Sequence, residues 1–313
     1  MMKKLLAILM ALTFIFALAS CGSKTEGETT TTEAITEESE TETETETQTE
    51  AESKEDESET ETTTQGESKE DETEEDESTT EKEEQKVPST KAEILAAYTE
   101  VMNQAKKDAP GFTKTEYQEL PEAGRVINKG ETLVNTALKV AGNFMTTKDK
   151  AESDPEIKEK GNNMRSWPVL KCPKGCMLTN ESAIKSAKCE ELSNGNYKIT
   201  IVLNDENNPE PAKEGATTAP SAHGSVFSPL SKSEIDDALN GGIVSAVFKD
   251  ITYTLRYHDC STVLVYNPEN NHVVSLDQTC HVSIKASAKA LGATLDIGNQ
   301  ELINYMSIKN IKY

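Results

Sequence analysis

Residues 251–288 read ITYTLRYHDCSTVLVYNPENNHVVSLDQTCHVSIKASA, and apolar side chains alternate with polar ones along most of this stretch. Such alternation is typical of β-strands that bury one face. The segment Asn267-Pro268-Glu269-Asn270-Asn271 interrupts it with residues that favour turns. The stretch therefore predicts an antiparallel hairpin with strands over residues 243–266 and 272–291, followed by a third strand over 294–313.

The first of these strands changes phase near its middle. Its apolar positions are odd-numbered up to Tyr257 and even-numbered from Cys260 onward. An extra residue in one strand has this effect, so we predict a β-bulge near His258-Asp259, where the sheet would bend. In the second strand a single phase is expected to hold for Val274, Leu276, Cys280, Val282, Ile284, Ala286 and Ala288.

Upstream residues predict helices and further strands. Thr90 and Glu93 have capping-box spacing before an apolar pattern of helical period, which predicts a helix over 91–108. A second helix is expected over 131–144 and a short one from Ser231 or Ser233 to Leu239. Strands are expected at 112–120, 185–192 and 197–203, with connections at 147–163 and 205–221.

Residues 88–313 are therefore expected to form one α+β globular domain. Its N-terminal helices would pack on a curved antiparallel β-sheet, a meander whose most curved form is a half-barrel. A segment of this length is long enough to bury a substantial core.

The N-terminal part of the sequence has the features of an export signal. Lys3 and Lys4 precede an apolar run over residues 5–18, which is shorter than the ~20 residues that a membrane-spanning helix needs. A basic start, a short apolar segment and small residues at its end are typical of a signal peptide, here residues 1–20.

Ala19 and Ser20 stand directly before Cys21, and this pattern resembles the bacterial lipobox. The resemblance implies that Cys21 carries a thioether-linked diacylglyceryl group and becomes the mature N-terminus. The protein would then be anchored by lipid to the extracellular face of the cell membrane. An ordinary signal peptide followed by a chance cysteine is the alternative.

Residues 21–87 predict a disordered acidic linker. Positions 22–86 hold 27 acidic residues and 5 lysines, a net charge of −22 out of −23 for the whole chain. A Thr/Glu-rich segment with so few apolar side chains cannot offset the entropy lost on ordering. We interpret it as a spacer between membrane and domain. The domain itself is nearly neutral, which argues against nucleic-acid binding.

The folded part is similar to uncharacterised exported lipoproteins of Gram-positive bacteria. The similarity is carried by residues 91–105, 110–114, 197–203 and 266–275. The expected layout of helices on a curved sheet also resembles lipid-carrying lipoproteins with a half-barrel fold. A likeness at the level of the fold says little about activity.

The domain contains five cysteines, and exported proteins can form disulfides. Cys172 and Cys176 could form a local bridge, or either could pair with Cys189. Since five is odd, at least one thiol stays unpaired in a monomer. These candidates for disulfide bonding are Cys172, Cys176, Cys189, Cys260 and Cys280.

The hairpin register expected from the turn places position 260 near 278 and position 258 near 280. His258, Cys260 and Cys280 would then share a face, and His281 would point away. Three interpretations stay open: buried cysteines beside a histidine, a Cys260–Cys280 disulfide that needs a register shift of two, or a zinc site. We assign no metal ligands.

The chain lacks the sequence signatures of common enzymes. It has no Gly-x-Ser-x-Gly, no His-Glu-x-x-His, no phosphate-binding loop and no dinucleotide fingerprint. His223 lies in Ser221-Ala222-His223-Gly224-Ser225, but no acidic partner is placed by spacing, so we read it as a loop histidine. Trp167 is read as a core residue, with a sugar-stacking platform as the alternative.

These observations favour a lipid-anchored surface lipoprotein that displays a non-enzymatic binding domain on an acidic spacer. The expected ligand is a small apolar molecule, a glycan or another protein, and no cofactor is expected. The alternatives are an extracellular hydrolase of cell-wall or glycan substrates and a purely structural envelope protein.

Overall fold

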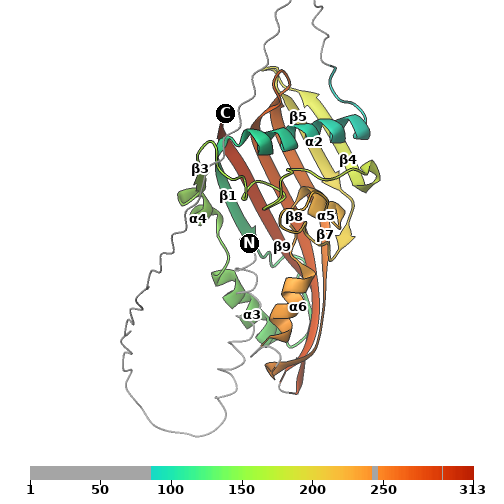
Figure 1. The fold of residues 1–313 in the computed structure, drawn as a ribbon. Helices are drawn as coiled ribbons and strands as arrows, with labels where there is room; N and C mark the ends of the chain where they lie inside the picture. The colour runs from blue at the N-terminus through green and yellow to red at the C-terminus, as the bar shows by residue number, and fades with distance from the viewer. Residues whose placement is uncertain (1–85, 242–245, 291) are drawn as a thin grey trace, which may run out of the picture. The chain divides into compact units, whose positions relative to one another are not determined.

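The computed structural model describes residues 86–241, 246–290 and 292–313, whose strands form one nine-stranded sheet (Figure 1). Neighbouring strands are antiparallel throughout these residues. The order is β3-β1-β9-β8-β7-β5-β4, with β2 beside β9 and β6 beside β7. The strands are β1 (Gly111–Glu119), β2 (Val126–Lys129), β3 (Glu156–Lys158), β4 (Ile184–Glu191), β5 (Tyr197–Leu203), β6 (Glu206–Asn207), β7 (Phe248–Asn267), β8 (His272–Ala290) and β9 (Ala293–Lys312).

The described helices are fewer than the strands, and most of them are short. The edge strands β3 and β4 form no ladder with each other in the described part of the chain, so the sheet is not closed into a barrel. The α+β class and the antiparallel sheet are confirmed. The helices are α2 (Lys91–Asp108), α3 (Glu131–Asn143), α4 (Lys148–Ser153), α5 (Ala222–Val226) and α6 (Lys232–Asn240), with a 3₁₀ turn at Glu181–Ala183.

Helix α2 begins and ends where the sequence predicts. The Thr90 side chain accepts a hydrogen bond from the Glu93 amide, and the Glu93 carboxylate accepts one from the Thr90 amide, which completes the capping box. Ala109 adopts a left-handed conformation (φ 46°) and terminates the helix. The Tyr98 hydroxyl lies 3.0 Å from Thr262 Oγ1 of β7, and both side chains are fully buried.

The predicted bulge in β7 is confirmed. Asp259 and Cys260 lie opposite the single residue Cys280, and Asp259 has φ 47°. The ladder pairs on either side of the bulge are His258 with His281 and Ser261 with Thr279. The extra residue in β7 therefore carries Cys260 to Cys280, so the predicted register, in which position 260 lies near 278, was wrong.

The predicted phase of β8 fails near the turn. The ladder also shifts between Val265 and Tyr266, which pair with Ser275 and Val273. As a result Val273 is buried, whereas Val274 is 45% exposed. This irregularity beside the turn accounts for the change, and the sequence signal for it was not recognised.

The segment 147–163 is more ordered than the exposed connection that we expected. Helix α4 starts at the Thr147 cap, and β3 pairs with β1 through Phe112 and Lys158. The short helix α5 was also not expected, because five residues are too few to show a helical period. The hairpin of β4 and β5 and the Ser231 cap of α6 are confirmed.

Candidate functional site

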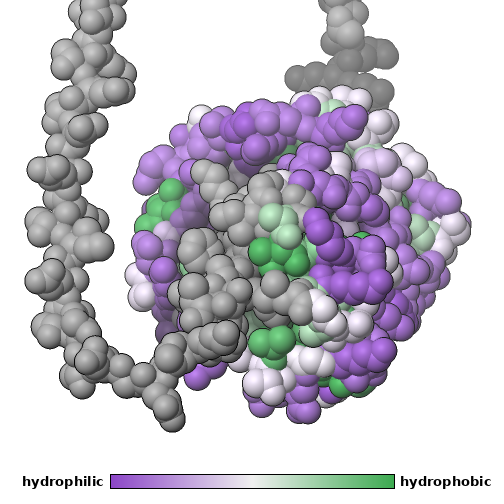
Figure 2. All heavy atoms as spheres, turned by 90° about the horizontal axis from the view of Figure 1, so that it is seen from below, coloured by the Kyte–Doolittle hydropathy of each residue, from purple (hydrophilic) through white to green (hydrophobic). Residues whose placement is uncertain are grey.

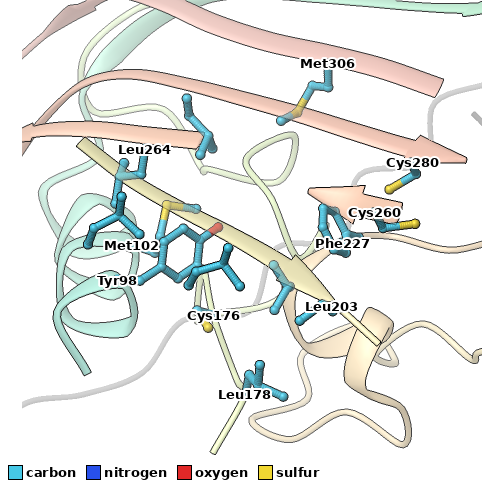
Figure 3. Close-up of a cluster of buried hydrophobic side chains, with 14 of the residues drawn as sticks. Tyr98, Met102, Cys176, Leu178, Leu203, Phe227, Cys260, Leu264, Cys280 and Met306 are labelled. Carbon is cyan, nitrogen blue, oxygen red and sulfur yellow. The ribbon is translucent and has the colours of Figure 1, made fainter. Parts of the chain in front are cut away.

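A small apolar pocket lies on the face of the sheet that carries the core. Side chains of β1, β7, β8 and β9 line it, together with Pro168, Leu170 and residues 227–230. Its volume is about 60 Å³. Tyr257, Val282, Leu302 and Met306 are among the apolar residues that line it, and Figure 3 shows Met306 in the same buried cluster as Cys280.

Polar side chains from β1 and β9 lie at one side of this pocket. Lys114 Nζ is 3.1 Å from Glu116 Oε2 and donates to the Ser166 carbonyl at 3.2 Å. Gln118 Nε2 donates to Asn304 Oδ1 at 2.9 Å. The second carboxylate oxygen of Glu116, Oε1, is buried and has no hydrogen-bond partner among the described residues. The pocket therefore offers an acceptor for a hydrogen-bond donor.

Two thiols lie at the wall of the pocket and just behind it. Cys280 lines the pocket, and Cys260 lies opposite it across the bulge. The Cys260 Sγ donates to the carbonyl oxygens of His258 at 3.5 Å and His281 at 3.7 Å. Cys260 is fully buried and Cys280 is 8% exposed. Both are free thiols in the structure, and Figure 3 shows them on neighbouring strands.

His223 of α5 reaches the same place from the other side. Ser221 caps α5 by accepting from the Gly224 amide at 2.8 Å, and this turn directs His223 into the core, where it is fully buried. Its Nδ1 lies 2.8 Å from Glu206 Oε2, which also accepts from the His223 amide at 3.1 Å. Nε2 is buried and has no hydrogen-bond partner among the described residues.

The result is a row of groups in the order Glu206, His223, Cys260, Cys280 and pocket. The neighbouring Cys280 thiol lowers the pKa of Cys260, burial opposes this, and His223 lowers it further. The same contact with Cys260, together with burial, raises the pKa of Cys280. Burial alone would lower the pKa of His223, but Cys260 and Glu206 outweigh it and the net shift is upward. Both shifts favour a thiolate at Cys260 beside a protonated imidazole.

The sequence did not reveal this row. His223 was read as a loop histidine without an acid, and the structure corrects this because it supplies Glu206 from β6. Glu206 stands in the polar segment 205–221, and pairing of β6 with β7 brings it to α5. A strand of two residues carries no periodic signal from which the contact could be found.

We expected His258 to share a face with Cys260 and Cys280, and this was wrong: neither His258 nor His281 lies on that face. Their rings lie 5.6 Å apart on the other face of β7 and β8, and both contact Glu301 at 3.2 Å. His258 also contacts Asp259 at 3.1 Å. No group of three or more histidine, cysteine or acidic residues in the described ranges has the geometry to hold a metal ion.

The other candidate residues lie elsewhere. Cys172, Cys176 and Cys189 are free thiols, and burial raises the pKa of each. The disulfide assignments remain predictions. Trp167 is fully buried with its ring edge-on to Phe112 at 5.3 Å, so it is a core residue and not a sugar platform. Cys21 lies outside the described residues.

Where Figure 2 leaves the described residues in view, small apolar patches lie among hydrophilic side chains. In the described ranges no helix has the length and hydropathy required to cross a bilayer. Comparisons with protein-family models, with curated proteins and with solved structures give no match.

Proposed function

We propose that this chain is an exported lipoprotein, held by lipid on Cys21 at the extracellular face of the cell membrane, whose α+β domain binds a small ligand. The acidic linker over residues 21–87 would hold the domain away from the membrane. The binding site is the pocket beside Glu116. The observation that carries the proposal is a mostly apolar pocket that contains a buried, unpartnered carboxylate oxygen.

The size of the pocket defines the ligand class. About 60 Å³ is well under the ~150 Å³ cavity that takes up benzene, and one water-sized probe needs about 10–15 Å³. An acyl chain or a sugar ring does not fit in this volume. A short aliphatic group with a hydroxyl or amine is small enough, and Glu116 Oε1 would accept a hydrogen bond from it. The proposed ligand is therefore such a molecule, or the end of a larger one.

We further propose that the helices pack on one face of the curved sheet, as in a half-barrel. Tyr98 ties α2 to β7, and Val134 of α3 packs with Phe248 and Leu295 near the far end of the long strands. Figure 1 shows α2 crossing the strands and α3 and α6 near the lower ends of β7–β9. Helices on one face of an open, curved sheet support this layout.

The binding proposal ranks above the hydrolase and the structural alternatives. A glycan hydrolase with two acidic groups needs a pair of carboxylates in its cleft, whereas Glu116 is the one carboxylate among the residues that line the pocket. A purely structural role provides no reason for a buried acceptor without a partner.

Binding is tested by amide chemical shifts during titration of the full chain with propan-1-ol and, as a matched control, ethyl methyl ether, which lacks a donor. We expect the alcohol to shift the amides of β1 and β9 around the pocket more strongly than the ether. Met306→Phe, which fills the pocket, should abolish the effect. Equal responses to both compounds, or a response that survives Met306→Phe, would refute the site.

The anchor is tested separately by growing cells on labelled palmitate. Label should enter the protein and be lost in Cys21→Ala. Label-free protein, or label retained in the variant, would contradict lipidation at Cys21.

A further inference from the structure

We propose that residues 164–171 form a gate at the pocket beside Glu116, which opens as a unit to admit a ligand and which Lys106 and Lys114 hold closed. The gate controls access to the binding site and therefore rests on the proposed function. It lies between β3 and the 3₁₀ turn at Glu181–Ala183, where none of the described residues belongs to a helix or a strand. In the view of Figure 1 this irregular part of the chain passes across the sheet from β3 to β4.

The pocket gives a ligand little room to enter while all of its walls stay in place. None of its lining residues is exposed, and most are buried. The walls that come from β7, β8 and β9 are fixed by continuous strand pairing. The remaining lining residues, Pro168, Leu170 and 227–230, lie outside the ladders. Entry therefore requires one of these two irregular segments to move.

Backbone strain singles out the first of the two segments. Three of its residues have a left-handed backbone although they are not glycine, with φ of 50° at Met164, 51° at Val169 and 59° at Lys171. Such a conformation disfavours the residue by about tenfold each time, and it is rarest for a β-branched side chain such as Val169. The described residues 227–230 include no such residue, and the Leu230 amide is tied to the Tyr257 hydroxyl at 3.0 Å. Strain of this kind lasts only where the surroundings enforce it.

Lys106 of α2 supplies the main restraint on the strained segment. Its side chain is buried, and Nζ donates to the carbonyl oxygens of Met164 at 2.8 Å, Val169 at 3.3 Å and Trp167 at 3.4 Å. Two of these carbonyls belong to the left-handed residues themselves. Buried backbone outside helices and strands has few partners for its carbonyl groups, and bonds from a charged donor are the strong ones. The ammonium thus favours the closed gate.

Lys114 of β1 connects the gate to the ligand site. Its Nζ donates to the Ser166 carbonyl at 3.2 Å and lies 3.1 Å from Glu116 Oε2. Glu116 is the carboxylate that would accept a hydrogen bond from the ligand. A bound ligand also meets Pro168 and Leu170 only while the gate is closed. Binding should therefore favour the closed gate and slow its opening.

The first test measures opening without any ligand, by native-state amide hydrogen exchange of the full chain. The Trp167 and Cys172 amides donate to the Met164 and Val169 carbonyls, each at 3.3 Å. We expect both amides to exchange faster than the amides of the β8–β9 ladder, because a gate opens while the sheet stays folded. Equal protection in gate and ladder would show that the segment opens only on global unfolding, and would overturn the proposal.

The second test measures access to the pocket through Cys280, which lines it. The folded full chain is treated with methyl methanethiosulfonate, and labelling is followed by peptide mass spectrometry. Lys106 is not among the lining residues, so Lys106→Met removes the restraint and leaves the pocket groups in place. Loss of a charge-assisted bond should speed labelling of Cys280 and exchange of the gate amides about tenfold or more. Labelling of Cys189, on the edge strand β4, should stay the same; an unchanged rate at Cys280 would contradict the gate.

Lys171 provides a matched pair of variants that spares the core. Its side chain is 51% exposed, and both Lys171→Gly and Lys171→Ala lose the 3.6 Å contact with Glu214. Only glycine adopts the left-handed conformation without strain, so Lys171→Gly should stabilise the closed gate. Cys280 should be labelled about tenfold more slowly in Lys171→Gly than in Lys171→Ala. Equal rates in the two variants would overturn the role of strain, whether or not Lys106→Met folds.

A third measurement separates failure of the gate from failure of the binding proposal. Propan-1-ol that shifts the amides of β1 and β9 should also slow labelling of Cys280 in the parent protein. Shifts without any slowing would refute the gate and leave binding intact. If propan-1-ol causes no shifts, the proposed function fails, and the gate stands or falls on hydrogen exchange and on the labelling rates of the variants.

Discussion

Tyr98→Phe removes the contact that ties α2 to the middle of β7. The Tyr98 hydroxyl and Thr262 Oγ1 are 3.0 Å apart, and neither side chain has measurable exposure. Deleting one partner leaves the Thr262 hydroxyl buried without its bond, which costs about 1–3 kcal/mol. With a urea m-value of about 3 kcal/mol/M, a 2 kcal/mol loss lowers the unfolding midpoint by about 0.7 M.

Thr262→Val in the Tyr98→Phe background supplies the matched control. When both hydroxyls are replaced by apolar groups of the same shape, no buried donor is left unpaired and most of the stability should return. Gln278 also interacts with the Tyr98 hydroxyl, so a small residual loss is expected. The assay is urea unfolding followed by circular dichroism for the four proteins of the cycle. A single variant as stable as the parent, or a double variant that loses the sum of both effects, would refute the reasoning.

Three further predictions concern other parts of the domain. Thr90→Ala should lower the free energy of unfolding by about 1 kcal/mol, because it breaks the capping box of α2. The control Thr136→Ala, at an exposed position of α3, should change the free energy of unfolding by less than about 0.5 kcal/mol. Equal effects of the two substitutions in urea unfolding would argue against the cap. Gly224→Ala should destabilise the domain and displace α5, because the added Cβ would lie 2.1 Å from the Glu210 carbonyl oxygen. The control Gly142→Ala adds a Cβ in open space and should stabilise α3 by about 0.5–1 kcal/mol. A Gly224→Ala variant as stable as the parent would contradict this packing. Burial lowers the pKa of His258, but Asp259 and Glu301 outweigh burial and the net shift is upward, so the ion pair of His258 with Glu301 stabilises the fold fully below about pH 6.5 and is lost as the pH rises through the raised pKa. The unfolding free energy lost in Glu301→Gln should therefore become smaller toward alkaline pH. A loss that does not change with pH would contradict the assignment.

Local patterns predicted much of the fold. The capping box and apolar period of α2 depend on neighbouring residues, and both helix ends were correct. The phase change in β7 likewise located the bulge, because a strand with one face buried must keep its apolar side chains on that face. The turn over residues 267–271 joined β7 to β8 as expected.

What could not be predicted depends on contacts between distant segments. A phase change does not show which residue is extra, so Cys260 was paired with the wrong partner. The register shift beside the turn exposed Val274 for a related reason. Glu206 meets His223 through β6, which has two residues, and α5 has five, so neither carries a periodic signal. The candidate site therefore became visible only when these segments were placed together.

The central claim is that the small pocket beside Glu116 binds a molecule that carries a hydrogen-bond donor. Its most direct test is the change in the amide chemical shifts of β1 and β9 when propan-1-ol is added to the full chain, with Met306→Phe as the reference. The account predicts shifts in the parent that saturate with propan-1-ol and are absent from the variant. Shifts of the same size in parent and variant would contradict the account.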